Sequence, residues 1–364
     1  MTDQSAELRV FSSASRYVQG PGALDALGQY AGHLGNRAVV LIDAFMLPRL
    51  GVRIERSLAD ASVTSKITPI EGEVTPARIA ALAARVKAFD PGFIVGVGGG
   101  KAIDIAKGVS RSLSIPIVTV PTIASNDSPA SRVIAVYDDD HRLAEVVPMD
   151  SNPALVVVDS EVIFDAPAKF LAAGIGDAIS KRFEAEACRL AEGLTPQGTR
   201  SLQVARLIAD GAYDVLRTHG PAATAAAKRG ELNEDYEHTL EAVILLSGLA
   251  FENGGLSIAH AVTRGLMAVS ETSAHLHGEH VAYGLLVQLA LAAEADEVLD
   301  DHAEFLRSIG LPDSLHALGC EPTGSVLDTI VSAALTAPHI VNFPAPVDAG
   351  SLTDAILRVE RRFG

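Results

Sequence analysis

Three residues in the second half of the chain have side chains that together suit a catalytic metal. Asp177 lies in Ala-Gly-Ile-Gly-Asp-Ala, His260 in Gly-Gly-Leu-Ser-Ile-Ala-His-Ala, and His277 in His-Leu-His-Gly-Glu-His-Val-Ala. One carboxylate and two imidazoles leave a fourth position open, as a catalytic zinc requires. We expect Asp177 at a helix start, His260 inside a helix and His277 at the start of the next. Spacing alone leaves the alternative open that the histidines are hydrogen-bonded core residues.

A glycine run in the first half suits a phosphate-bearing ligand. Gly98-Gly99-Gly100-Lys101 follows an expected strand and opens an expected helix, Ala102–Val109. Glycines let the backbone approach a ligand, and the free N–H groups at a helix start favour an anion such as a pyrophosphate. The alternative is a turn that binds nothing, because the run differs from the usual dinucleotide fingerprint.

Three charged residues near this run bear on its role. Asp43, at the end of another expected strand, is placed to bind an adenosine ribose and to disfavour a 2′-phosphate, unless it only caps a helix. Asp104 and Lys107 lie one turn apart on the new helix, where at least one of them would face a ligand cleft.

Composition limits the class of protein. The 364 residues include 29 basic and 45 acidic side chains, a formal charge of −16, which argues against a nucleic-acid or anionic-membrane surface. Cys188 and Cys320 are too few for a disulfide framework and are expected to be buried thiols. We expect a cytoplasmic protein, because neither a secretion signal nor an uninterrupted membrane span is apparent.

The elements that would position these residues differ between the two halves. The first half alternates helical stretches, such as 76–89, with β-branched runs at 39–43, 93–97, 117–120 and 155–159, and adds a hairpin over 132–147 with an acidic turn. The pattern of the second half predicts amphipathic helices, with breaks near 220–221, 254–255, 310–312 and 344–346. The sequence therefore predicts an α/β nucleotide-binding domain, residues 1–163, and an all-α metal-binding domain, residues 164–364, with the site in a cleft between them.

Five separated motifs, in this order, resemble the glycerol dehydrogenases, which belong to the iron-/zinc-dependent alcohol dehydrogenases with a dehydroquinate-synthase-like fold. The likeness covers residues 17–318, and the motifs are Val-Gly-Gly-Gly-Lys-x-x-Asp-x-x-Lys, Val-Pro-Thr-Ile-Ala-Ser-x-Asp-x-Pro-x-Ser, Ala-Gly-Ile-Gly-Asp-Ala, Gly-Leu-x-Phe-Glu-x-Gly-Gly-Leu-x-x-Ala-His-Ala and His-Gly-Glu-x-Val-Ala-x-Gly.

The resemblance implies reversible, NAD-dependent oxidation of glycerol or a similar vicinal diol to a hydroxyketone, by metal-assisted alkoxide formation and hydride transfer. Asp177, His260 and His277 would hold Zn²⁺, or another divalent metal such as Fe²⁺, and Asp127 would contact the substrate hydroxyls and help to move the proton. The only partners implied are the small alcohol and further copies of the chain in a homo-oligomer, often an octamer. The implied NAD site consists of Asp43, Gly98, Gly99, Lys101, Thr122, Ser131, Val133 and Tyr137.

The sequence departs from the family pattern at several positions. Asn126 stands where the family usually has threonine, and Arg132 where it usually has a small residue. Three residues after His260 the family commonly has a second histidine, whereas this chain has Thr263, followed by Arg264. Lys181, one turn after Asp177, replaces an uncharged residue, and we interpret it as a surface change. The pattern often has lysine at the position of His280, which is therefore expected to be a non-ligand, while His33 and His141 are expected to be surface or structural residues.

Three other enzymatic activities are alternatives to diol oxidation on this fold. A reductase of another hydroxyketone or of a 2-hydroxy acid would use Arg132 or Arg264 for an anionic group. A glycerol-1-phosphate dehydrogenase fits the loop 126–129 less well, and a non-redox cyclase of the dehydroquinate-synthase type needs basic residues that we do not find near Asp177. A binding protein without activity is disfavoured by the intact ligand trio.

Overall fold

The computed structural model describes residues 8–138 and 143–364, which form two compact units. One unit is Ser12–Pro167, and the other joins residues 8–11 to Ala168–Gly364. The expected domain limits, 1–163 and 164–364, differ from this division by four residues at the junction and by the segment 8–11.

The unit Ser12–Pro167 is built on a six-stranded parallel sheet with the strand order β1-β8-β5-β4-β2-β3. The four inner strands carry the β-branched runs expected from the sequence, and the two edge strands are additional. The strands are β1 Tyr17–Gly20, β2 Arg37–Asp43, β3 Thr64–Ile70, β4 Phe93–Gly98, β5 Ile117–Pro121 and β8 Leu155–Asp159.

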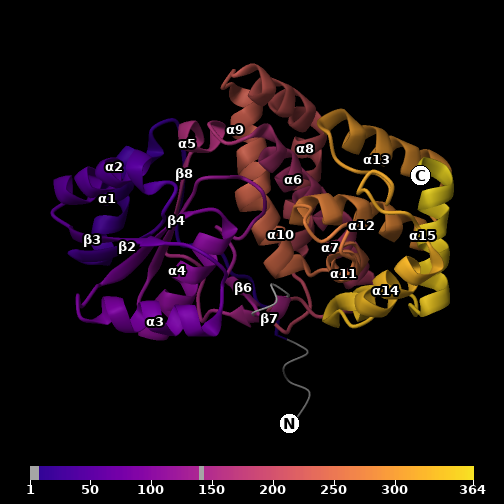
Figure 1. Cartoon of the computed structure of the whole chain (residues 1–364), viewed down its shortest axis with the longest axis horizontal. Helices are drawn as coiled ribbons and strands as arrows, with labels where there is room; N and C mark the ends of the chain where they lie inside the picture. The colour runs from indigo at the N-terminus through magenta and orange to yellow at the C-terminus, as the bar shows by residue number, and fades with distance from the viewer. Residues whose placement is uncertain (1–7, 139–142) are drawn as a thin grey trace, which may run out of the picture. The chain divides into compact units, whose positions relative to one another are not determined.

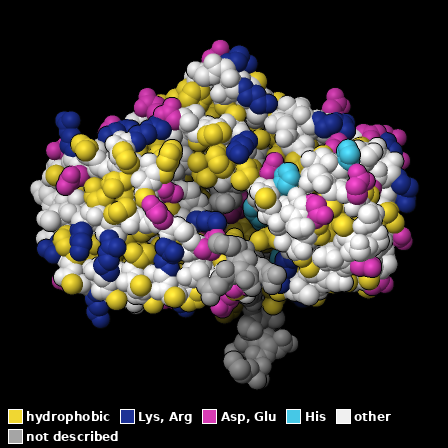
Figure 2. Space-filling view, in the orientation of Figure 1, with side chains coloured by type: hydrophobic (Ala, Val, Ile, Leu, Met, Phe, Trp, Pro, Cys, Tyr) yellow, Lys and Arg dark blue, Asp and Glu magenta, His cyan; other side chains and the backbone are white. Residues whose placement is uncertain are grey.

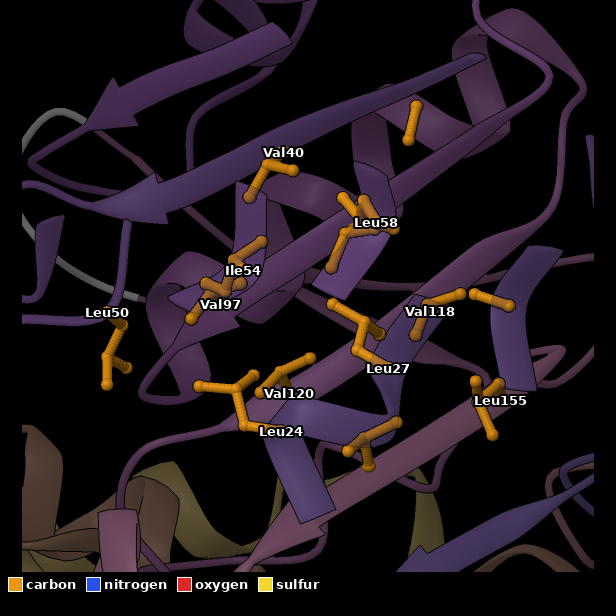
Figure 3. Packing of buried hydrophobic residues seen from close by; sticks show 14 of the residues in the cluster. Leu24, Leu27, Val40, Leu50, Ile54, Leu58, Val97, Val118, Val120 and Leu155 are labelled. Atoms are coloured by element: carbon orange, nitrogen blue, oxygen red, sulfur yellow. The ribbon is translucent and has the colours of Figure 1, made fainter. Parts of the chain in front are cut away.

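Helices cover both faces of this sheet (Figure 1). Helices α1 (Leu27–Ala31) and α2 (Leu47–Asp60) pack on one face, where Leu27, Leu50 and Ile54 meet Val40 and Val118 (Figure 3). Helices α3 (Pro76–Lys87) and α4 (Gly100–Leu113) pack on the other face. Because both faces are buried, the inner strands are almost wholly apolar.

A two-stranded antiparallel ribbon follows β5. It consists of β6 (Val133–Tyr137) and β7 (Leu143–Pro148), as the expected hairpin requires. The expected turn residues Asp139, Asp140 and His141 lie outside the described residues. Helix α5 (Ser160–Phe164) ends this part of the chain.

The described residues of Ala168–Gly364 form helices and no strand. These are α6 Ala168–Ile179, α7 Lys181–Leu190, α8 Gln203–Arg229, α9 Glu234–Glu241, the π-helix η3 Ala242–Leu246, α10 Ser247–Gly254, α11 Ile258–Met267, α12 His277–Leu291, α13 Asp296–Ile309, α14 Gly324–Ala334, the 3-10 helix η4 Pro338–Asn342 and α15 Ala349–Phe363.

One expected break in this unit is wrong. Gly220 and Pro221 lie inside α8, which runs through to Arg229. A proline removes one helical hydrogen bond, but the packing of α8 against α6, α7, α9 and α10 keeps the helix continuous.

The C-terminal helix is tied down by ion pairs. In α15, Arg358 binds Asp296 of α13 at 2.7 Å, and Arg362 binds Asp300 at 2.5 Å. Figure 2 shows basic and acidic side chains intermixed over this pair of helices. Such exposed pairs each stabilise the fold by roughly 0.2–1 kcal/mol.

Within the described part of the chain, no single helix combines the length and apolar composition needed to cross a membrane. Glu234–Gly254 and Ile258–Met267 satisfy both criteria only as a pair, which is bent by 103°.

Candidate metal centre and cofactor site

Glycines allow the helices that carry the three candidate ligands to approach one another closely. A Cβ atom on Gly176 would collide with the carbonyl oxygen of Gly278, so the end of α6 touches the start of α12. A Cβ atom on Gly284 would collide with the carbonyl oxygen of Ala259, which holds α11 against α12. The first contact lies next to Asp177 and His277. The second lies next to His260 and two helical turns after His277. Close packing of these helices therefore brings together residues that are far apart in sequence.

The three candidate ligands converge. The Nε2 atom of His260 lies 3.2 Å from Oδ1 of Asp177, and Nε2 of His277 lies 3.7 Å from the same oxygen. One ligand atom from each residue falls within 4.8 Å of the others. A tetrahedral zinc with ligands at about 2.0–2.2 Å separates them by roughly 3.3–3.6 Å. The donor set and its spacing therefore fit a zinc-sized cation.

The structure corrects one detail of their placement. Asp177 lies in the last turn of α6, not at a helix start, whereas His260 is inside α11 and His277 begins α12. Asp177 and His260 are almost fully buried, and 42% of the His277 side chain is exposed. His277 is thus the member of the trio that a substrate can reach from solvent.

Glu184 fixes the orientation of His260, and the sequence analysis did not identify it. Its carboxylate lies 2.6 Å from Nδ1 of His260 and also accepts from the backbone N–H groups of His260 and Ser257. Burial would raise the pKa of Glu184, but His260 and Lys181 lower it to about 2. With the Nδ1 proton directed to this carboxylate, Nε2 is free to ligate, and such partners strengthen metal binding. The sequence feature that could have identified Glu184 is an acidic residue seven positions after Asp177, on a helix face whose other residues are buried.

The interpretation of Lys181 as a surface change is wrong. Its side chain is 2% exposed, and Nζ lies 2.5 Å from Oδ1 of Asp177 and 3.2 Å from Nε2 of His260. Burial would raise the pKa of Asp177, but the Lys181 ammonium and the two histidines hold it well below its usual range. Desolvation lowers the pKa of His277, against the attraction of Asp177, which favours the neutral imidazole that binds a metal.

Two further histidines lie close to the trio. His280 is buried, and its Nε2 atom lies 2.8 Å from the carbonyl oxygen of Thr272, away from the candidate ligands. His339 was not singled out by the sequence. It hydrogen-bonds to the backbone of His260, and burial together with the neighbouring His260 lowers its pKa to about 4. Among the described residues its Nε2 atom has no hydrogen-bond partner.

In the other unit, the glycine run that is expected to form a phosphate cradle lies at the carboxyl end of β4, next to Asp43 at the end of β2. Gly98 has φ = +149°, and a Cβ atom there would lie 2.6 Å from Cβ of Ala102 and 3.0 Å from Cβ of Asp43. Gly99 is the N-cap of α4 and has no side chain to occupy the space in front of the helix N-terminus. This geometry leaves the N–H groups of the first turn open to an anion.

Asp43 and Lys101 line a cavity of about 310 Å³ with Gly72 and Glu73. Asp43 accepts a hydrogen bond from the Phe45 N–H at 2.9 Å and is not the cap of α2, whose N-cap is Met46. Lys101 binds Glu73 at 2.7 Å. The Asp43 carboxylate would repel a phosphate group bound next to it in this cavity.

Two of the remaining expected cofactor residues, Ser131 and Val133, contact a buried lysine. Thr122 donates its backbone N–H to the carbonyl oxygen of Gly98 at 3.0 Å. Lys107 is fully buried, and its Nζ donates to the carbonyl oxygens of Ser128 (2.6 Å) and Val133 (2.9 Å) and lies 3.5 Å from Ser131 Oγ. Lys107 therefore fixes the loop from Ser128 to Val133, and both it and its partner Asp104 are buried in these contacts.

The other expected residues of this unit lie in the same loop or in β6. Burial, Asp104 and Glu73 raise the pKa of Tyr137 to about 12. Asp127 is largely buried, and its carbonyl oxygen accepts from the N–H groups of Ala130 and Ser131, which closes a turn. Arg132 donates from Nη1 to the carbonyl oxygen of Met149 at 3.0 Å.

Two residues that depart from the family pattern, Asn126 and Arg264, contact neighbouring polar groups. The side-chain oxygen of Asn126 accepts the Ser128 N–H at 3.1 Å, and a Cβ atom on Gly100 would lie 3.2 Å from its side-chain nitrogen. Asn126 therefore flanks the phosphate cradle. Arg264 contacts the carbonyl and hydroxyl oxygens of Thr336, each at 3.4 Å.

Comparisons with known proteins agree with these features. Residues 14–160 match the iron-containing alcohol dehydrogenase family. The glycerol dehydrogenase of Escherichia coli is 35% identical over 96% of this chain and 96% of its own length, and the glycolaldehyde reductase of Halobacterium salinarum is 34% identical over 96% and 97%. A crystal structure of a probable glycerol dehydrogenase from Sinorhizobium meliloti superposes with a TM-score of 0.92, at 34% identity, over 98% of this chain and 99% of that one. The chain therefore belongs to the glycerol dehydrogenases of the iron-containing alcohol dehydrogenase family, and it is an alcohol dehydrogenase.

Proposed function

We propose that the enzyme oxidises glycerol, or a similar small vicinal diol, to a hydroxyketone with NAD, using zinc bound by Asp177, His260 and His277. The observation that carries the proposal is the convergence of these three donors at zinc-like spacing, in a chain whose relatives are named glycerol dehydrogenases. The resemblance also supports a homo-oligomeric enzyme of the cytoplasm.

The helical unit would provide the metal centre. A zinc ion held by Asp177, His260 and His277 would supply Lewis-acid chemistry for an alcohol hydroxyl group. Asp177 supplies the negative charge, Glu184 keeps the ring of His260 oriented, and the exposed edge of His277 lies toward solvent. Three protein ligands leave one position for substrate.

The unit Ser12–Pro167 would bind NAD. The N-terminus of α4, with Gly98 and Gly99, would bind the pyrophosphate, and Asp43 would accept hydrogen bonds from the adenosine ribose. Lys101, Thr122, Ser131, Val133 and Tyr137 complete the proposed cofactor set. These residues would orient the nicotinamide, and NAD would supply the hydride-accepting chemistry.

Asp127 would anchor the substrate. A carboxylate accepts hydrogen bonds from the hydroxyl groups of a diol, and the same group is suited to take up the proton. The turn closed by Ala130 and Ser131, on a loop that Lys107 holds, supports a fixed position for Asp127.

The proposal is tested with purified enzyme on a panel of diols, hydroxyketones and hydroxy acids, with NAD and NADP, and with metal analysis of the same sample. We expect the highest kcat/KM for glycerol or 1,2-propanediol with NAD, and about one zinc per chain. A kcat/KM for 2-hydroxy acids far above that for every neutral diol would contradict the proposal.

Replacing Asp43 by serine should reduce the preference for NAD over NADP. Loss of the carboxylate removes the repulsion of a 2′-phosphate and one partner of the ribose hydroxyls. The measurement is the ratio of kcat/KM for NAD and NADP, for which we expect a fall of about tenfold or more. Glu71→Gln, which removes a neighbouring charge at the same cavity, serves as the control. An unchanged ratio in Asp43→Ser would show that this carboxylate does not contact the ribose.

A further inference from the structure

Lys181 occupies the place of a cation among the proposed metal ligands. Its Nζ atom lies 2.5 Å from Asp177 Oδ1 and 3.2 Å from His260 Nε2, two of the three atoms that would ligate zinc. Both the Lys181 and Asp177 side chains are 2% exposed. The ammonium is therefore an internal part of the centre, and the inference drawn from it rests on the proposed metal site.

The ammonium in this position and a zinc ion exclude one another. Zinc would lie about 2.0–2.2 Å from Asp177 Oδ1 and His260 Nε2, in the region where Nζ now makes its contacts. Two cations at such short range repel strongly in a buried site. Binding of the metal thus requires the Lys181 side chain to withdraw.

The surroundings explain why a buried lysine is tolerated here. Asp177 and Glu184 are both buried carboxylates, and a buried charge without compensation destabilises the fold strongly. Lys181 follows Asp177 by one helical turn and lies within hydrogen-bond distance of its carboxylate, which compensates the charge of the ammonium.

We propose that Lys181 is a built-in substitute for the metal. It neutralises the ligand set when zinc is absent, which keeps the metal-free protein stable, and it competes with zinc for Asp177 and His260, which weakens zinc binding. The helical unit would then hold its ligands in position before the metal arrives.

The test compares Lys181→Met, which has a similar length and no charge, with the wild type. After removal of metal by chelation, zinc affinity is measured by competition with a chromophoric chelator, and Tm is measured with and without zinc. We expect zinc to bind about tenfold or more tightly in the variant, because the competing charge is gone. We also expect a lower Tm without metal and a larger rise in Tm on zinc addition.

Arg182→Met is the matched control, because it removes the next positive charge on α7. Arg182 is 41% exposed and pairs with Asp210 at 3.2 Å, outside the ligand set. Its zinc affinity should equal that of the wild type. An equal or weaker zinc affinity in Lys181→Met would overturn the proposal.

A second measurement does not depend on the folding of the variant. In crystal structures of the wild type with and without zinc, Nζ should move out of hydrogen-bond distance of Asp177 Oδ1 when zinc is present. Zinc bound to the trio with Nζ still at 2.5 Å would overturn the role of Lys181 alone. If zinc binds elsewhere in the wild type, the metal site itself is wrong.

Discussion

Replacing His277 by alanine should abolish turnover and release the zinc. Two protein ligands are too few for a stable zinc site, and Asp177 and His260 would remain as the only members of the trio. The fold should persist, because His277 is the most exposed of the three and begins a helix that is otherwise anchored by its buried face. NAD binding should be nearly unchanged, since the proposed cofactor residues belong to the other unit. The measurements are zinc content after dialysis, kcat with glycerol, and NADH binding by fluorescence.

His275→Ala is the control for this variant. His275 lies two residues earlier, pairs with Glu279 at 3.4 Å and is not among the converging donors. Its zinc content and kcat should stay near those of the wild type. Full zinc occupancy and activity in His277→Ala would show that His277 is not a ligand.

The sequence was most informative where a strand is buried on both faces. The runs in β2, β4, β5 and β8 are apolar at nearly every position, because helices cover both sides of the sheet. The edge strands were missed. All four residues of β1 are only half buried, and β3 contains the exposed Thr64 and a proline, as suits an edge. A short or half-exposed strand leaves no continuous apolar run to detect.

At the proposed metal centre, residue types and motifs pointed to Asp177, His260 and His277, but the sequence alone could not show that they meet. Their convergence depends on the tight contacts at Gly176, Gly278 and Gly284, which are tertiary features. The same limit applies to Lys181, where a charged residue one turn after an aspartate on a helix usually faces solvent. Its burial follows from contacts with Asp177 of α6 and His260 of α11, and the second of these is distant in sequence.

Asp127→Ala should lose most of the activity on glycerol. A hydrogen bond to a charged group contributes about 1.5–3 kcal/mol, so the loss of this anchor should lower kcat/KM by roughly 10- to 150-fold. If Asp127 also takes up the proton, the reduction will be greater and will appear in kcat. Zinc content and NADH binding should be retained, because Asp127 is neither a member of the trio nor part of the phosphate cradle.

Substrates of different charge distinguish substrate binding by Asp127 from a purely structural role of Asp127 in its loop. A carboxylate at position 127 repels a substrate carboxylate, so its removal should improve the relative kcat/KM for a hydroxy acid while that for glycerol falls. Loss of loop structure would lower both, and Asp127→Asn, which keeps the size and loses the charge, should show the same change in preference in a milder form. We expect that Arg132 does not compensate the negative charge of Asp127 toward an anionic substrate, because its guanidinium donates to the carbonyl oxygen of Met149. Wild-type kcat/KM for glycerol in Asp127→Ala would remove Asp127 from the proposed site.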